Sequence, residues 1–222
     1  MKKGGQVSTS RDWKERLSVS RDLGTGFAAP GGEFTRALYE WSLTPNGSFL
    51  QRLLEKRRVV ELGAGMMPYG YAFAANCRAK NFVAVEPFYA DKQAASVRAM
   101  IEEQGNLLPR IPYKVEGMDM LEYLKGEADN LLCIVACGIE DCILPGANYR
   151  KQVEGEIYRV LEKDAFFLCS HSDLQPMELQ NREVSFKRPA NPKVEDRLRL
   201  YGKKEAFDKY GDMLAEKFLS LH

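Results

Sequence analysis

The chain has 222 residues, of which 45% are hydrophobic and 28% charged, with 32 basic and 31 acidic residues. This length supports one sizeable core and not two large domains. A formal charge of +1 provides no overall field toward nucleic acid or an anionic membrane. No window reaches the roughly 20 apolar residues of a membrane-spanning helix. The five cysteines form no CxxC pair, which argues against a paired-cysteine zinc or redox site. We expect a soluble cytoplasmic protein that holds no metal.

The N-terminal part is expected to differ from the rest. Residues 1–33 are polar and glycine-rich, which predicts a tail or a mobile lid. Two amphipathic helices should follow, because hydrophobic residues recur at helical spacing. These residues are Phe34, Leu38 and Trp41 in the first helix, then Leu50, Leu53 and Leu54 in the second. We interpret residues 1–57 as an N-terminal tail and helical lid, and residues 58–222 as the main domain.

From residue 58 onward, short apolar segments alternate with longer amphipathic ones. The expected strands are residues 59–62, 81–86, 111–119, 130–138 and 165–170, and the expected helices are residues 68–79, 90–105 and 149–163. Strands that are apolar throughout and alternate with helices predict an α/β, Rossmann-like fold with a mostly parallel sheet covered on both faces. Two late strands, residues 182–189 and 196–204, should be joined by a turn at 190–195 and followed by a helix at 205–221.

A glycine turn follows the first predicted strand. Gly63 and Gly65 lie in the segment VVELGAG, where glycine permits a tight bend and a close approach of the backbone to a ligand. A lone G-x-G is weak evidence, and a turn without a ligand is the alternative. Glu61 lies on the same apolar strand, where an unpaired buried carboxylate is costly. We therefore expect Glu61 to face the crevice and to meet a donor.

Acids also end the next two strands. Glu86 ends the second strand, 21 residues after Gly65, where a carboxylate can accept hydrogen bonds from two ribose hydroxyls. Asp119 ends the third strand and could accept from an exocyclic amine such as that of adenine. Each acid alone fits a solvated loop residue, but the three together indicate a site for an adenosine-containing ligand.

Five segments together resemble a known family: VVELGAGMMP, FVAVEP, VEGMDMLEYL, LLCIVACGIEDCILPG and EGEIYRVLEKDAFFLCS. Over residues 58–173 the chain resembles the class I S-adenosylmethionine-dependent methyltransferases, in particular their small-molecule branch. The resemblance implies a seven-stranded sheet with an antiparallel strand at one edge, and S-adenosylmethionine as cofactor. Binding of NAD is the alternative, but it would favour glycine at Pro68 and would not explain Glu61.

The resemblance also implies roles for individual residues. Gly63 and Gly65 would hold the methionine portion by their backbone above Glu61, and Glu86 would bind the ribose hydroxyls. Asp119 would take the adenine amino group, with Met118 and Met120 along the base. Cys137 would offer its carbonyl oxygen to the ligand's ammonium. The full expected cofactor set is Glu61, Gly63, Ala64, Gly65, Glu86, Pro87, Met118, Asp119, Met120 and Cys137.

Three departures from the family pattern are visible. Many members have a third glycine where Met67 stands, a histidine where Asp141 follows Glu140, and a Pro-Gly-Gly turn where residues 162–165 read EKDA. The change at Asp141 puts the acceptor chemistry in doubt. Since methyl transfer from a sulfonium requires alignment and a general base only for a protonated acceptor, no motif has to mark a catalytic residue.

Three residues are candidates for contact with the methyl acceptor. Glu140 and Asp141 follow the fourth strand, and His171 follows the fifth. An acid pair at such a place can instead cap a helix, and a lone histidine in a loop is commonly structural. We therefore assign no catalytic residue from the sequence.

The expected partner is a small-molecule substrate. The segment 182–204 carries eight basic and three acidic residues, so an RNA methyltransferase is one alternative, although aromatic residues are few there. A second alternative is a non-catalytic subunit that keeps the fold and binds a partner.

Overall fold

The computed structural model describes residues 30–219 apart from 66–68, 88, 90, 105–107, 140 and 142. For residues 30–33, 91–93, 104 and 217–219 it describes the backbone alone. The predicted tail up to residue 29 and Glu140 therefore lie outside the described residues. The helices are α2 (Pro30–Ser42), α3 (Phe49–Leu54), α4 (Tyr69–Asn76), α5 (Asp91–Gln104), α6 (Met120–Gly126), α7 (Ala147–Val160) and α8 (Lys204–Leu219). The strands are β1 (Arg58–Leu62), β2 (Asn81–Val85), β3 (Tyr113–Glu116), β4 (Cys133–Cys137), β5 (Phe166–Ser170), β6 (Gln180–Arg188) and β7 (Asn191–Gly202).

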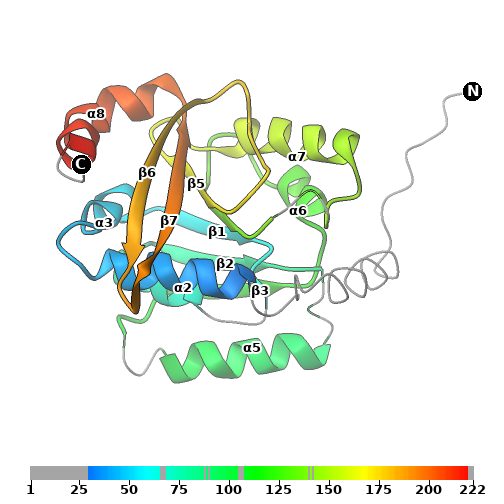
Figure 1. Ribbon diagram of the computed structural model, residues 1–222. Coiled ribbons are helices and arrows are strands. Elements are labelled where there is room, and N and C mark those ends of the chain that lie inside the picture. Colours follow the sequence, from blue (N-terminus) through cyan, green and yellow to red (C-terminus); the bar gives the residue numbers. More distant parts are fainter. Residues whose placement is uncertain are drawn as a thin grey trace, which may run out of the picture.

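The strands form one seven-stranded sheet in the order β3-β2-β1-β4-β5-β7-β6 (Figure 1). The first five are parallel, and β7 pairs antiparallel with both β5 and β6. Strands β4 and β5 are buried at every position, as expected for central parallel strands with covered faces. The chain order reverses between β1 and β4, which is where a crevice forms beyond the strand ends in such sheets.

The helices lie in two layers (Figure 1). Helices α2 and α4 pack against each other, α4 contacts β2, and α5 contacts β3, while α6 and α7 pack together on the other side of the sheet. Helix α8 follows β7 and contacts it. The sequence analysis did not predict α6. It is seven residues long, too short for a clear hydrophobic period, and it begins after the N-cap residue Asp119.

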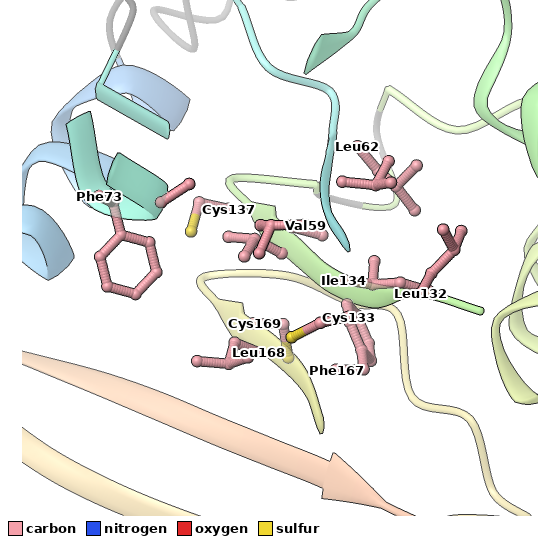
Figure 2. Close-up of a cluster of buried hydrophobic side chains, with 14 of the residues drawn as sticks. Val59, Leu62, Phe73, Leu132, Cys133, Ile134, Cys137, Phe167, Leu168 and Cys169 are labelled. Atoms are coloured by element: carbon pink, nitrogen blue, oxygen red, sulfur yellow. The ribbon is translucent and has the colours of Figure 1, made fainter. Parts of the chain in front are cut away.

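The core joins both predicted parts of the chain. Figure 2 shows its central cluster, in which Val59, Ile134 and Leu168 from three strands lie together. Leu38 and Leu50, from the helices that the sequence analysis assigned to a lid, are fully buried in the same core. Helices α2 and α3 are therefore packed parts of the domain, which gives the side chains of α2 fixed positions against the sheet.

The late hairpin has a shorter turn than expected. The turn was predicted at residues 190–195, but β6 extends to Arg188 and β7 begins at Asn191. Pro192 lies near the start of β7, a place where a strand tolerates proline. A register shift between Lys187 and Arg188 accommodates the tight connection. In the hairpin, β7 therefore pairs with β6 at the edge of the sheet and with β5 on its other side.

A buried arginine explains the changed turn at residues 162–165. Arg57 is 7% exposed, and its guanidinium donates to Glu162 Oε2 at 2.6 Å and to Asp164 Oδ1 at 2.9 Å. It also donates to the Asp164 carbonyl at 2.8 Å. The hydrogen bond from Arg57 holds the pKa of the Asp164 carboxyl well below its usual range. Arg57 and its two acidic partners therefore link the segment before β1 to the segment before β5. This contact lies at the amino ends of the strands, and the glycine turn lies at their carboxyl ends.

Candidate functional site

The glycine turn has the geometry that requires glycine. Gly63 and Gly65 have φ angles of 65° and 62°, in the left-handed region. A Cβ at Gly63 would overlap the Cδ1 atom of Ile139, which lies just after β4. The amides of Gly63 and of the buried Ala64 donate to the Val85 carbonyl at 2.9 and 3.2 Å. These two amides are therefore satisfied by β2 without a ligand.

Glu86, which follows β2, contacts the glycine turn. The residue is 5% exposed, and its Oε2 accepts from the Gly65 amide at 3.2 Å. The half-buried Pro87 follows, and then Tyr89 donates its hydroxyl to the Gly65 carbonyl. A Cβ at Gly117 would overlap the Tyr89 carbonyl. The sequence analysis predicted Glu86 but missed Tyr89, because an aromatic residue in a loop carries no pattern that reveals its partner.

Glu61 lies beneath the turn, as its position on β1 predicted. Its side chain is 3% exposed, and Oε1 accepts from the Thr35 hydroxyl of α2 at 2.8 Å. A Cβ at Gly70, in the first turn of α4, would overlap Oε2, so glycine there leaves room for the carboxyl. Burial raises the pKa of Glu61 to about 8; the bond from Thr35 lowers it, and the charge of Glu86 raises it. Glu61 is therefore largely uncharged at neutral pH in the ligand-free protein.

Asp119 has partners of its own. It is the N-cap of α6, and Oδ1 accepts from the amides of Leu121 and Glu122 at 2.8 and 3.3 Å. The Tyr149 hydroxyl of α7 lies 2.9 Å from Oδ1 and 2.7 Å from Oδ2. An adenine amine at Asp119 would have to share these oxygens with Tyr149 or displace it. The flanking methionines differ in exposure, since Met118 is partly buried and Met120 is 3% exposed.

Cys137 and Ser170 are the last residues of the neighbouring strands β4 and β5. The Cys137 thiol is buried, and burial followed by the nearby Glu61 carboxyl raises its pKa well above its usual value. The next amide, of Gly138, donates to the Ser170 carbonyl at 3.0 Å. The Ser170 hydroxyl is buried, and in the part of the chain that the structure describes it has no hydrogen-bond partner. A buried hydroxyl without a partner is uncommon, so it marks a polar position at the carboxyl ends of these strands.

Asp141 and His171 line one cleft of about 490 Å³. The Asp141 carboxylate is 60% exposed and accepts from Arg150 at 2.7 Å, while its amide donates to Asp173 Oδ2 at 2.7 Å. His171 is held by Asp196 on β7, through Nε2 and Oδ1 at 2.9 Å. The cleft thus brings together two of the three predicted acceptor residues.

Three of the eight basic side chains of the hairpin form ion pairs within it. Arg188 donates to Asp196 at 2.6 Å, and Arg199 donates to Glu183 at 2.7 Å. Arg197 lies 3.6 Å from the same Glu183. These three arginines would therefore contact a phosphate backbone only at the expense of a carboxylate partner.

Two classes of site find no support in the described ranges of the chain. Within residues 30–219 and outside the gaps named above, no cluster of three or more histidine, cysteine or acidic side chains could hold a metal ion. In the same ranges no helix combines the length and apolar character needed to cross a bilayer.

The sheet order, the glycine turn after β1 and the acids after β2 and β3 define the class I S-adenosylmethionine-dependent methyltransferase fold, so the chain has this fold. The sequence matches no known family model and no curated protein.

Solved structures with the same fold are distant in sequence. Spermidine synthase from Thermotoga maritima is 11% identical with a TM-score of 0.51, over 82% of this chain and 65% of its own. The nicotianamine synthase MtNAS, in complex with MTA and tNA, is 14% identical with a TM-score of 0.50, over 87% of this chain and 69% of its own. A methyltransferase from Geobacter sulfurreducens is 15% identical with a TM-score of 0.49, over 90% of this chain and 91% of its own.

The residues present fit a cationic nucleoside at most points. Glu61 is a buried acid without a balancing cation among the residues that the structure describes, and a sulfonium or ammonium group would supply one. Ser170 offers an unpaired hydroxyl at the same edge. Asp119 is the exception, because its oxygens already accept from α6 and Tyr149.

Proposed function

We propose that the chain is an S-adenosylmethionine-dependent methyltransferase that acts on a small molecule. The observation that carries this proposal is the Glu61 carboxyl, buried against Thr35 and Gly70 directly beneath the glycine turn. In the described part of the chain this buried acid with a raised pKa has no ion-pair partner, and a ligand that carries a positive charge close to the turn would stabilise its ionised form.

In this proposal the chain's own residues bind the cofactor and orient it. The cofactor, when bound, supplies a methyl group on a cationic sulfur. The carboxylate of Glu86 lies where it can accept from ribose hydroxyls, and the turn at Gly63 lets the backbone approach the ligand. The Ile139 side chain lies against Gly63 and makes one side of the turn apolar. The protein's contribution is therefore alignment and desolvation, which can supply several kcal/mol of the barrier.

The acceptor class follows from the cleft and from the hairpin. A cleft of about 490 Å³ is within the usual size for small ligands. The pairing of Arg188 and Arg199 with carboxylates argues against RNA as the main substrate. The two structures with TM-scores of at least 0.50 are named as synthases and not as methyltransferases. The fold alone therefore does not show that the transferred group is a methyl group.

Calorimetry with S-adenosylmethionine, S-adenosylhomocysteine and NAD tests the cofactor. We expect both nucleosides to bind and NAD not to bind. Gly65→Asp and Glu86→Ala should abolish binding while circular dichroism stays unchanged, and Glu103→Ala, an exposed acid on α5, is the matched control. Binding of NAD alone, or unchanged nucleoside affinity in both site variants, would contradict the proposal.

The transferred group is tested with two labelled forms of the cofactor. Label in the methyl group should pass to the acceptor fraction of a metabolite extract, whereas label in the carboxyl group should stay with the nucleoside. Transfer of the carboxyl label instead would identify a different alkyl transfer, and transfer into the RNA fraction would identify RNA as the acceptor.

A further inference from the structure

His171 has a left-handed backbone, and two neighbours hold its ring. Its φ angle is 49°, in the left-handed region, which costs a residue with a side chain about 1–2 kcal/mol. The ring stacks on Phe34 of α2, with centroids 3.7 Å apart and planes 11° from parallel. Nε2 lies 2.9 Å from Asp196 Oδ1. The left-handed backbone and the two ring contacts fix the position of the imidazole.

Asp196 determines which ring nitrogen carries the hydrogen. It is 1% exposed on β7 and accepts from Arg188 through both oxygens, at 2.6 Å from Nε and 3.2 Å from the terminal nitrogen. A carboxylate held by arginine acts only as an acceptor. His171 must therefore donate from Nε2, and in the neutral ring the lone pair is then on Nδ1. In the described part of the chain, no hydrogen bond involves Nδ1.

His171 is connected to the cofactor side of the sheet through two elements. On α2, Phe34 stacks on His171 and the next residue, Thr35, donates to Glu61. On the loop after β5, the Asp173 amide donates to the Ile139 carbonyl at 2.8 Å, and Ile139 covers the glycine turn. The ring therefore contacts the helix that also holds Glu61, and its loop is hydrogen-bonded to the loop that carries Ile139.

The cleft that His171 lines is polar and of mixed charge. Asp141 and Asp173 lie on the loops after β4 and β5, and Glu195, Arg197 and Arg199 lie on the exposed face of β7. Arg197 and Arg199 form ion pairs with Glu183, and Asp141 forms one with Arg150. A half-exposed imidazole, with a side chain 39% exposed, is thus open to a small polar molecule.

We propose that His171, oriented by Asp196, is the proton acceptor for a hydroxyl group on the methyl acceptor. This inference rests on the proposed function. The hydroxyl oxygen forms the new bond to the methyl carbon as the carbon–sulfur bond breaks, and that electron pair stays on sulfur, which becomes neutral. The hydroxyl proton passes to Nδ1, and Asp196 balances the imidazolium charge. Alcohols and phenols keep their proton at neutral pH, so a positioned base fits an alcohol or a phenol as acceptor.

Nitrogen-15 spectra of the ligand-free full chain test the tautomer. The chain has two histidines, so His171→Gln assigns the signals. We expect the Nε2–H form for neutral His171. In Asp196→Asn, Arg188 should retain the amide oxygen and turn the amide nitrogen toward His171, which converts the ring to the Nδ1–H form. Asp173→Asn, in the same loop, is the control and should keep the Nε2–H form. An Nδ1–H form in the unmutated chain overturns the proposal, whether or not Asp196→Asn folds.

Access and acceptor class are tested on the same sample. Phenol should shift the Nδ1 resonance, whereas anisole, which has the same ring without a hydroxyl hydrogen, should not. Equal shifts with both probes, or no shift with phenol up to its solubility limit, overturn the assignment to a hydroxyl. These readouts use protein without cofactor, so their failure is distinct from a failure to bind S-adenosylmethionine, which would contradict the proposed function instead.

Discussion

Binding of the cationic cofactor should release a proton from Glu61. With a pKa of about 8, this carboxyl is ionised in about one molecule in ten at pH 7 and about one in a hundred at pH 6. If the cofactor binds only the ionised form, its dissociation constant should fall about tenfold from pH 6 to pH 7 and then level off above pH 8. About 0.9 protons should leave per ligand bound at pH 7.

Calorimetry in two buffers measures this release. The difference in observed heat between phosphate and Tris, which have different ionisation enthalpies, gives the number of protons released. Glu61→Gln keeps the shape of the side chain and its contact with Thr35 but cannot ionise, so we expect no release and a pH-independent, weaker affinity. Glu162→Gln, at the opposite edge of the sheet, should behave as the unmutated chain.

The same ionisation sets a stability effect with a defined sign. Because folding raises the pKa of Glu61 from 4.5 to about 8, its contribution is fully present below pH 4.5 and is lost as the pH rises toward 8. At about 1.4 kcal/mol per pH unit, the loss is on the order of 5 kcal/mol. Urea unfolding of the ligand-free protein should therefore show Glu61→Gln gaining stability relative to the unmutated chain between these pH values. A constant difference across this range, together with binding that releases no proton, would refute the reasoning.

Three further predictions concern packing and charge. Gly70→Ala should destabilise the fold by about 1–3 kcal/mol because the new methyl group overlaps Glu61 Oε2, while Gly155→Ala, with open space around it in α7, should stabilise by up to about 1 kcal/mol in urea unfolding. Arg57→Met should cost about 2–4 kcal/mol, and the variant should lose less stability below pH 4 than the unmutated chain, because the lowered pKa of Asp164 depends on Arg57. In a Cys142→Ser background, a thiol reagent at pH 8 should react only after unfolding, because burial raises the pKa of every remaining thiol. These thiols are Cys77, Cys133, Cys137 and Cys169.

The sheet was predictable because burial on both faces leaves a strong signature. The segments at 130–138 and 165–170 are apolar without alternation, and they became the buried strands β4 and β5. The helix α6 was not predicted, although Asp119 before it is a common N-cap residue and could have revealed it. The hairpin turn was misplaced because Pro192 was read as a turn residue, whereas it lies within β7.

The candidate site was predictable only where it depends on position along a strand. Glu61, Gly63 and Glu86 lie at the strand ends where the sequence analysis expected them. Thr35 and Tyr149 were missed because their partners are 26 and 30 residues away, and a hydroxyl on a helix gives no sign of what it faces. The roles of Asp141 and His171 depend on loops that bring β4, β5 and β7 together, which no single segment encodes.

Adjacent residues of α2 contact two different strand ends, since Thr35 bonds to Glu61 and Phe34 stacks on His171. A rigid helix cannot move one of these contacts without moving the other. Binding of the cofactor beside Glu61 should therefore change the affinity for an acceptor beside His171. By thermodynamic linkage the effect must be equal in both directions. This geometry predicts that the two substrates bind cooperatively.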